Sequence, residues 1–137
     1  MRLVTKLANL VTKFLNLVTM CAVAVVAAGC DDAPTPPVFD SLTMPDTATL
    51  DTASNSYVLK GSMSFHDPIA TITTLEIIVP TNKTTEKDVA INSSGGVVNP
   101  LVVQFDAATP KGVQMYSLVL VDDQMQSAEV DKTVTLQ

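Results

Sequence analysis

Apolar and polar residues alternate along most of the chain beyond residue 37. The clearest run places every second residue on one apolar face: Tyr57, Leu59, Gly61, Met63 and Phe65. The same alternation recurs in Leu75, Ile77 and Val79 and again in Val130, Val134 and Leu136. A period of two is typical of β-strands that bury one face. The pattern therefore predicts an all-β region without a helix after residue 37.

The most continuous apolar run of this region covers residues 113–121, interrupted by Gln114 and Ser117, and lies between turn-forming residues at 110–112 and 122–124. We interpret it as a central strand. In all, the pattern predicts seven strands, near residues 38–44, 56–65, 69–79, 86–91, 101–105, 113–121 and 128–136. Gly95 and Gly96 are expected to supply positive φ angles at a turn, and Pro100 is expected to keep the stretch before Leu101 out of a ladder interior.

Seven short strands in about 100 residues favour a single antiparallel β-sandwich, with a small barrel as the alternative. The motif Tyr57-x-Leu59-x-Gly61-x-Met63-x-Phe65-x-Asp67 is followed near the end by Tyr116-x-Leu118-x-Leu120-x-Asp122. Together these motifs resemble a bacterial immunoglobulin-like or fibronectin-III-like domain. The resemblance implies that the hydroxyl of Tyr116 forms a tyrosine corner, although the tryptophan and the cysteine pair of antibody domains are absent.

Charge divides the chain into two parts. Residues 1–29 carry three basic residues and no acidic one, whereas residues 30–137 carry five basic and fourteen acidic residues, a formal charge of −9. An acidic domain of this kind repels the phosphates of nucleic acid, so we expect no nucleic-acid partner.

The N-terminal part has the three regions of a secretory signal: a basic segment at 1–13, an apolar segment at 14–28 and a small residue, Gly29, before Cys30. We expect a helical signal peptide over residues 1–29. The apolar segment of about 15 residues is shorter than the roughly 20 that span a bilayer, which makes a transmembrane anchor the less favoured alternative.

Residues 26–30, Val-Ala-Ala-Gly-Cys, resemble the lipobox of a bacterial lipoprotein, although Ala27 replaces the usual Leu or Val. The resemblance implies that the sulfur of Cys30 takes a diacylglyceryl group, that cleavage precedes Cys30, and that its new amine is acylated, for example with palmitate. Asp31 and Asp32 then resemble an enterobacterial signal for retention at the inner membrane, or simply begin a solvated tether. The alternative is an ordinary signal cut near Ala28 or Gly29, which would release a soluble secreted domain.

The expected organisation is a signal peptide at 1–29, the lipidated Cys30 with a proline-rich tether at 30–37, and an immunoglobulin-like domain at 38–137. Prolines in the tether favour an extended spacer. Two or more acyl chains anchor a protein stably, since each buried methylene contributes about 0.8 kcal/mol.

Candidate chemistry in the domain is sparse. His66 is the one histidine, and its neighbours Ser64 and Asp67 are too close along a strand to build a Ser-His-Asp arrangement, so we expect no catalytic residue. In an immunoglobulin-like fold, two loops at one end would gather His66, Asp67, Asp122 and Asp123. The three aspartates are weak candidates for Ca²⁺, and the other interpretation is that they form turns. We expect no cofactor.

The sequence thus predicts a membrane-anchored bacterial lipoprotein whose β-sandwich is a non-enzymatic binding or structural module of the cell envelope, facing the periplasm or the exterior. Its expected partners are the membrane, through the lipid, and an envelope protein or polysaccharide. The rival from another class is a small carboxylate-dependent hydrolase, or an enzyme accessory subunit, that uses Asp67 and Asp122.

Overall fold

The computed structural model describes residues 33–80 and 85–137. The chain divides into two compact units, Met1–Ala33 and Pro34–Gln137. The expected signal helix at 1–29, the lipidation site at Cys30 and the acidic pair at 31–32 lie outside the described residues. Within the described part, no helix is long and apolar enough to cross a membrane.

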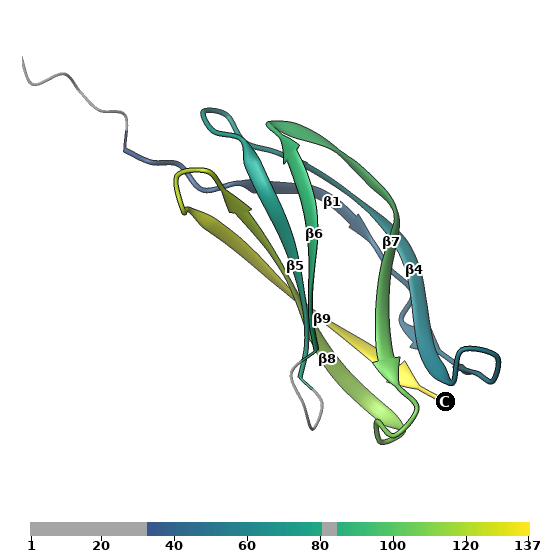
Figure 1. The fold of residues 1–137 in the computed structure, drawn as a ribbon. Helices are drawn as coiled ribbons and strands as arrows, with labels where there is room; N and C mark the ends of the chain where they lie inside the picture. Colours follow the sequence, from purple (N-terminus) through teal and green to yellow (C-terminus); the bar gives the residue numbers. More distant parts are fainter. Residues whose placement is uncertain (1–32, 81–84) are drawn as a thin grey trace, which may run out of the picture. The chain divides into compact units, whose positions relative to one another are not determined.

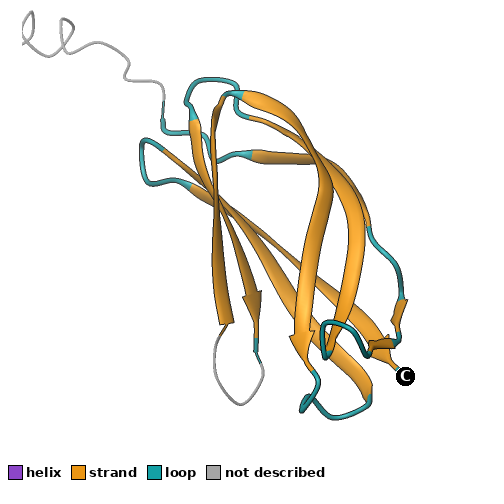
Figure 2. Cartoon of the chain, turned by 45° about the vertical axis from the view of Figure 1, so that its right-hand side comes forward, coloured by secondary structure: helices purple, strands orange, loops and turns teal. Residues whose placement is uncertain are grey.

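The second unit is built of β-strands in two sheets (Figures 1 and 2). The strands are β1 (Val38–Thr43), β2 (Thr47–Ala48), β3 (Leu50–Asp51), β4 (Ser56–His66), β5 (Ile72–Val79), β6 (Thr85–Ser93), β7 (Gly95–Asp106), β8 (Gly112–Asp122) and β9 (Ser127–Leu136). In sheet A, β4 pairs with β1 and β3 along one edge and with β7 along the other. Sheet B has the order β2-β9-β8-β5-β6. The expected all-β region is therefore confirmed, and β8 is a central strand as its apolar run predicts.

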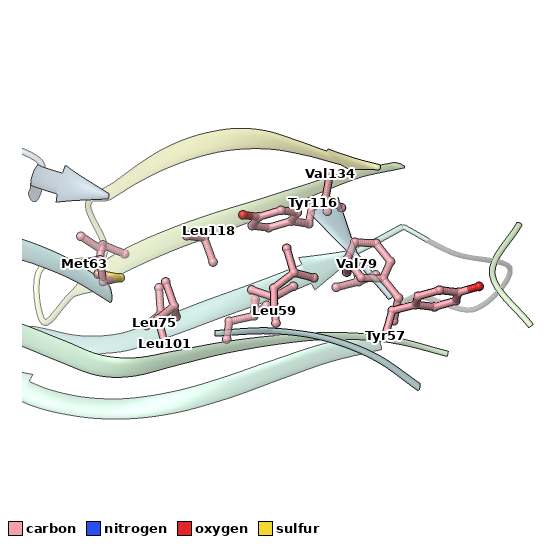
Figure 3. Close-up of a cluster of buried hydrophobic side chains, with 14 of the residues drawn as sticks. Tyr57, Leu59, Met63, Leu75, Val79, Leu101, Tyr116, Leu118 and Val134 are labelled. Atoms are coloured by element: carbon pink, nitrogen blue, oxygen red, sulfur yellow. The ribbon is translucent and has the colours of Figure 1, made fainter. Parts of the chain in front are cut away.

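One core joins the two sheets. It contains the apolar faces of the alternating strands, among them Tyr57, Leu59, Met63 and Phe65 of β4, Leu75, Ile77 and Val79 of β5, Leu101, Val103 and Phe105 of β7, Tyr116, Leu118 and Leu120 of β8, and Val134 and Leu136 of β9. Figure 3 shows part of this cluster between the ribbons, with Leu59, Leu75 and Leu118 among the labelled side chains. Phe105 and Tyr116, from different sheets, form an edge-to-face ring contact with centroids 6.2 Å apart. Burying such a cluster is the main driving force of folding.

The strand count and one pairing differ from the sequence prediction. Two additional strands, β2 and β3, have two residues each, too short for any alternation to reveal. Moreover β2 pairs with β9 in parallel, whereas the sequence predicts antiparallel pairing throughout. The cause is that the chain leaves sheet A after β1, joins the edge of sheet B as β2 and returns to sheet A as β3.

The expectations for Pro100 and for the glycine turn are wrong. β7 continues through Pro100, which follows a cis peptide bond and lies opposite a register shift between Gly61 and Met63 of β4. The shift leaves room in the ladder for a residue without an N–H donor. The residue with a positive φ near this turn is Asn92, with φ 54°, which lies within β6 one residue before its end, while Gly95 and Gly96 lie in β7 without a positive φ.

The two lateral sides of the unit are constructed differently. On one side, which we call the closed seam, residues 44–46 cross from β1 to β2, and β2 contacts β4 of the other sheet. A side chain at Gly61 would collide there with the carbonyl oxygen of Thr43 and with Sδ of Met44. On the opposite side, which we call the open seam, β7 of sheet A faces β5 and β6 of sheet B. Ser94 joins β6 to β7 at one end of this seam, and among the described residues no strand crosses between the sheets along the rest of it.

Candidate functional site

The β4–β5 loop begins with Asp67, which is 5% exposed. Its Oδ1 accepts hydrogen bonds from the backbone N–H groups of Ile69 (3.0 Å) and Ala70 (2.8 Å), and its own N–H donates to the carbonyl of Ser94 (2.7 Å). A short carboxylate that binds amides two and three residues ahead is a turn-forming arrangement. Asp67 therefore fixes its loop and ties it to the β6–β7 turn.

The β8–β9 loop is fixed in the same way, by a carboxylate that accepts hydrogen bonds from backbone N–H groups of the loop. Oδ1 of Asp122, a residue 2% exposed, accepts from the N–H groups of Gln124 (2.8 Å) and Gln126 (2.7 Å). Asp123 joins the two loops, since its N–H donates to the carbonyl of Thr71 (2.9 Å) and its Oδ1 accepts from the N–H of Thr71 (3.3 Å). The loops that the sequence predicts to share one end are thus hydrogen-bonded to each other.

His66 points elsewhere. It is the last residue of β4 rather than a loop residue, and its Nδ1 lies 2.7 Å from Oδ1 of Asp40 on β1, with both side chains about half exposed. The pair lies on the surface and makes no hydrogen bond to Asp67 or Asp122 among those described.

The aspartates at this end act as turn formers. Among the residues that the structure describes, no group of three His, Cys, Asp or Glu side chains is placed to hold a metal ion. The second oxygens of Asp67 and Asp122 are buried without a hydrogen-bond partner, while the first oxygens are occupied by loop amides. Buried carboxylates of this kind present no oxygen to a substrate in solvent.

Tyr116 lies in the core at 1% exposure, but its hydroxyl has no hydrogen-bond partner, so the tyrosine corner implied by the resemblance is not formed. Burial, together with the negative charge of Asp46 in the crossing segment, raises the pKa of Tyr116 to about 12. The hydroxyl is thus held neutral beneath the closed seam.

The open seam contains the concave surface that the sequence pattern did not indicate. One hollow of about 330 Å³ extends from the β3–β4 turn, at Ser54, along Gln104 and Asp106 of β7 to Val79 of β5. A second hollow of about 430 Å³ lies between Val98 to Val102 of β7 and Asp88 to Ala90 of β6. Both hollows touch Ile77 and Val102, so they adjoin each other along the seam.

A polar wall closes the first hollow at the β3–β4 turn. The Ser54 hydroxyl donates to Oδ2 of Asp51 (2.8 Å) and lies 2.8 Å from the hydroxyl of Ser56, which also accepts from Nε2 of Gln104 (2.8 Å). The hydroxyl of Ser54 and the N–H of Ala53 lower the pKa of Asp51 below its usual value. The wall is a chain of polar groups beside the apolar side chains of Ile77 and Val79.

Comparison with known proteins finds a solved structure whose fold is similar to that of this chain. Neither a family model nor a curated protein matches the chain. Among solved structures, wild-type OgpA from Akkermansia muciniphila is similar over 76% of this chain, with a TM-score of 0.51 at 8% sequence identity. The chain spans 29% of the length of OgpA. At this identity the likeness concerns the arrangement of strands and not the activity.

Proposed function

We propose that this chain is a lipid-anchored bacterial lipoprotein whose second unit is a fibronectin-III-like or immunoglobulin-like β-sandwich that serves as a non-enzymatic binding or structural module of the cell envelope. The observation that carries the proposal is the placement of Cys30. Cys30 is the last residue of a lipobox-like segment. The proline-rich residues 31–37 follow it, and the second compact unit begins among them, at Pro34.

Three features of the fold support the sandwich. The strands β1, β4 and β7 lie in one sheet and β6, β5, β8 and β9 in the other, which is the division of strands typical of fibronectin-III-like domains. The two sheets share one core. The segment before β1 enters beside the β4–β5 loop, because Val38 pairs with His66, whereas Leu136 pairs with Gly112 at the other end.

This arrangement suits a tethered module. The loops beside the entry point are fixed by Asp67, Asp122 and Asp123, whereas the open seam extends to the far end of the domain at Ser54 and Asp106. The rival hydrolase has less support, since the carboxylates it would use are buried and bonded to turn amides.

The mass of the N-terminal peptide tests the anchor. Protein recovered from the native membrane should begin at Cys30 with the mass of a diacylglyceryl group and an amide-linked acyl chain, and blocking the lipoprotein signal peptidase should preserve residues 1–29. The matched control is Cys30→Ser, which should leave the membrane fraction. An unmodified peptide beginning near Cys30 would overturn the proposal in favour of a soluble secreted domain.

A further inference from the structure

We propose that the open seam binds an extended, positively charged peptide segment of a partner protein, which adds to sheet A as a strand beside β7. This inference rests on the proposed binding role and specifies its site and the chemistry of its partner. It does not depend on the lipid anchor.

The lining of the hollows shows that they follow strand edges. Residues 100–102 and 104–106 of β7 all line them, as do residues 88–90 of β6. Successive side chains of a strand point to opposite faces of its sheet, so a surface that touches successive residues runs along the edge of the strand. A ligand in the seam therefore meets the backbone of β7 as well as side chains.

That edge has no partner within the described chain. β7 pairs with β4 alone and β6 pairs with β5 alone. The outward N–H and C=O groups of an edge strand form a template for one more strand, and peptides that bind in this way gain affinity from the ladder and specificity from side-chain pockets. The regular stretch of β7 beyond Pro100, Leu101 to Asp106, offers such an edge.

The side chains of the seam define the composition of the peptide. Its middle is apolar, with Ile77, Val98 and Val102. The charged lining residues are Asp88 in one hollow and Asp106 in the other, and among the side chains that the structure describes no Lys or Arg lines either hollow. Complementarity therefore favours apolar residues at alternate positions with a basic residue near each end. The six residues from Leu101 to Asp106 correspond to about 20 Å of strand.

A polysaccharide fits this surface less well than a peptide. The aromatic side chain in the lining is Phe105, which is 0% exposed and therefore offers no ring face on which a sugar could stack. The exposed backbone edge, by contrast, forms the regular ladder of hydrogen bonds that binds a strand, and a sugar has no matching backbone to pair with it.

The test uses the full chain purified in detergent and a seven-residue capped peptide that alternates valine and threonine and carries a lysine at each end. Binding is measured by fluorescence anisotropy, and hydrogen exchange locates it. We expect saturable binding and slower exchange of amides in Leu101 to Asp106. Two control peptides should fail: one with glutamates in place of the lysines, and one with N-methyl groups on the amides of one edge.

Variants of the seam then test the assignment. Asp88→Asn should weaken binding about threefold and the double variant with Asp106→Asn about tenfold, as expected for partly exposed ion pairs. Asn at 106 retains an oxygen for the N–H of Ala108, which Asp106 now holds (2.7 Å). The matched control is Glu129→Gln on β9, outside the seam, which should leave the affinity unchanged.

Several outcomes would overturn the inference: absence of binding, equal binding of the N-methylated peptide, indifference to both Asn variants, or protection confined to β8 and β9. Binding of an envelope polysaccharide to the seam, or self-association abolished by Val98→Lys, would assign the seam to another occupant. These results leave the N-terminal mass unaffected, so failure here is distinguishable from failure of the lipoprotein proposal.

Discussion

The closed and open seams lie between the same two sheets, but the closed seam is tightly packed and the open seam contains hollows. At the closed seam the chain itself crosses between the sheets, and backbone packs against backbone at Gly61 and Thr43. At the open seam β6 and β7 meet at their connecting turn and separate along their length (Figure 1), and two hollows lie between side chains there. Close packing tolerates little change of volume, whereas a hollow has space to relax. The first seam should therefore determine stability, and the second is available for binding.

The largest expected effect is that of Gly61→Ala at the closed seam. Its new methyl group would collide with a backbone carbonyl as well as with the flexible side chain of Met44, so the crossing segment must shift. We expect a loss of about 2–4 kcal/mol in the free energy of unfolding, measured by urea denaturation.

The matched control for this change is Gly96→Ala, where the added Cβ would lie 3.5 Å from Cζ of Phe65, an ordinary contact. A loss at Gly61→Ala no larger than that at Gly96→Ala would show that the closed seam is not rigid.

The next largest effect is a loss of stability at alkaline pH, caused by Tyr116 beneath the closed seam. Unfolded tyrosine ionises near pH 10, but burial keeps Tyr116 protonated in the folded protein until its pKa of about 12. Between these values the unfolded state binds fewer protons, so stability is complete below pH 10 and falls as pH rises, by about 2–3 kcal/mol at pH 12. Tyr116→Phe should remove the part of this alkaline loss of stability that comes from Tyr116, as measured by urea denaturation at a series of pH values.

At neutral pH the same variant should be neutral or up to about 1 kcal/mol more stable, because it removes a buried hydroxyl without a partner. Tyr57→Phe is the control, since Tyr57 directs its hydroxyl away from the core cluster (Figure 3). Retention of the full alkaline fall in Tyr116→Phe would assign that fall to other groups.

A direct contrast between the seams comes from two lysine substitutions. Met44 and Val98 are both half-buried and packed against the core, one at each seam. Met44→Lys must place its charge beside the crossing backbone, whereas Val98→Lys can extend its head through the second hollow into water. We expect Met44→Lys to lose about 1–2 kcal/mol more than Val98→Lys in thermal or urea unfolding. Equal losses would contradict the distinction between the seams.

The contrast also explains which features the sequence could predict. Strands such as β4 and β8 were predictable because the alternation in β4 and the apolar run in β8 are local signals that extend over nine or more residues. The crossing at 44–46 was not, since β2 and β3 are too short to show a period. The open seam was not predictable either, because it depends on how far β7 lies from β6, a tertiary property that no run of residues encodes locally. The pairing of loops at Asp67 and Asp122 followed from the fold, but their use as turn formers required the geometry.

The smallest expected effect lies at the polar wall of the open seam, where Asp51 is solvated and held by the hydroxyl of Ser54. Ser54→Ala should raise the pKa of Asp51 toward its usual value, measured by carboxyl carbon NMR. Since the folded pKa lies below the unfolded one, the stabilisation by the carboxylate is present above pH about 4 and is lost as pH falls through the lowered folded value. In Ser54→Ala this loss of stability at acid pH should be smaller.

Because Asp51 is exposed, Ser54→Ala should leave the urea midpoint at pH 7 almost unaltered, in contrast to Gly61→Ala. A large loss of stability at neutral pH would mean that the wall braces the two sheets, and the seam would then be structural rather than free to receive a strand.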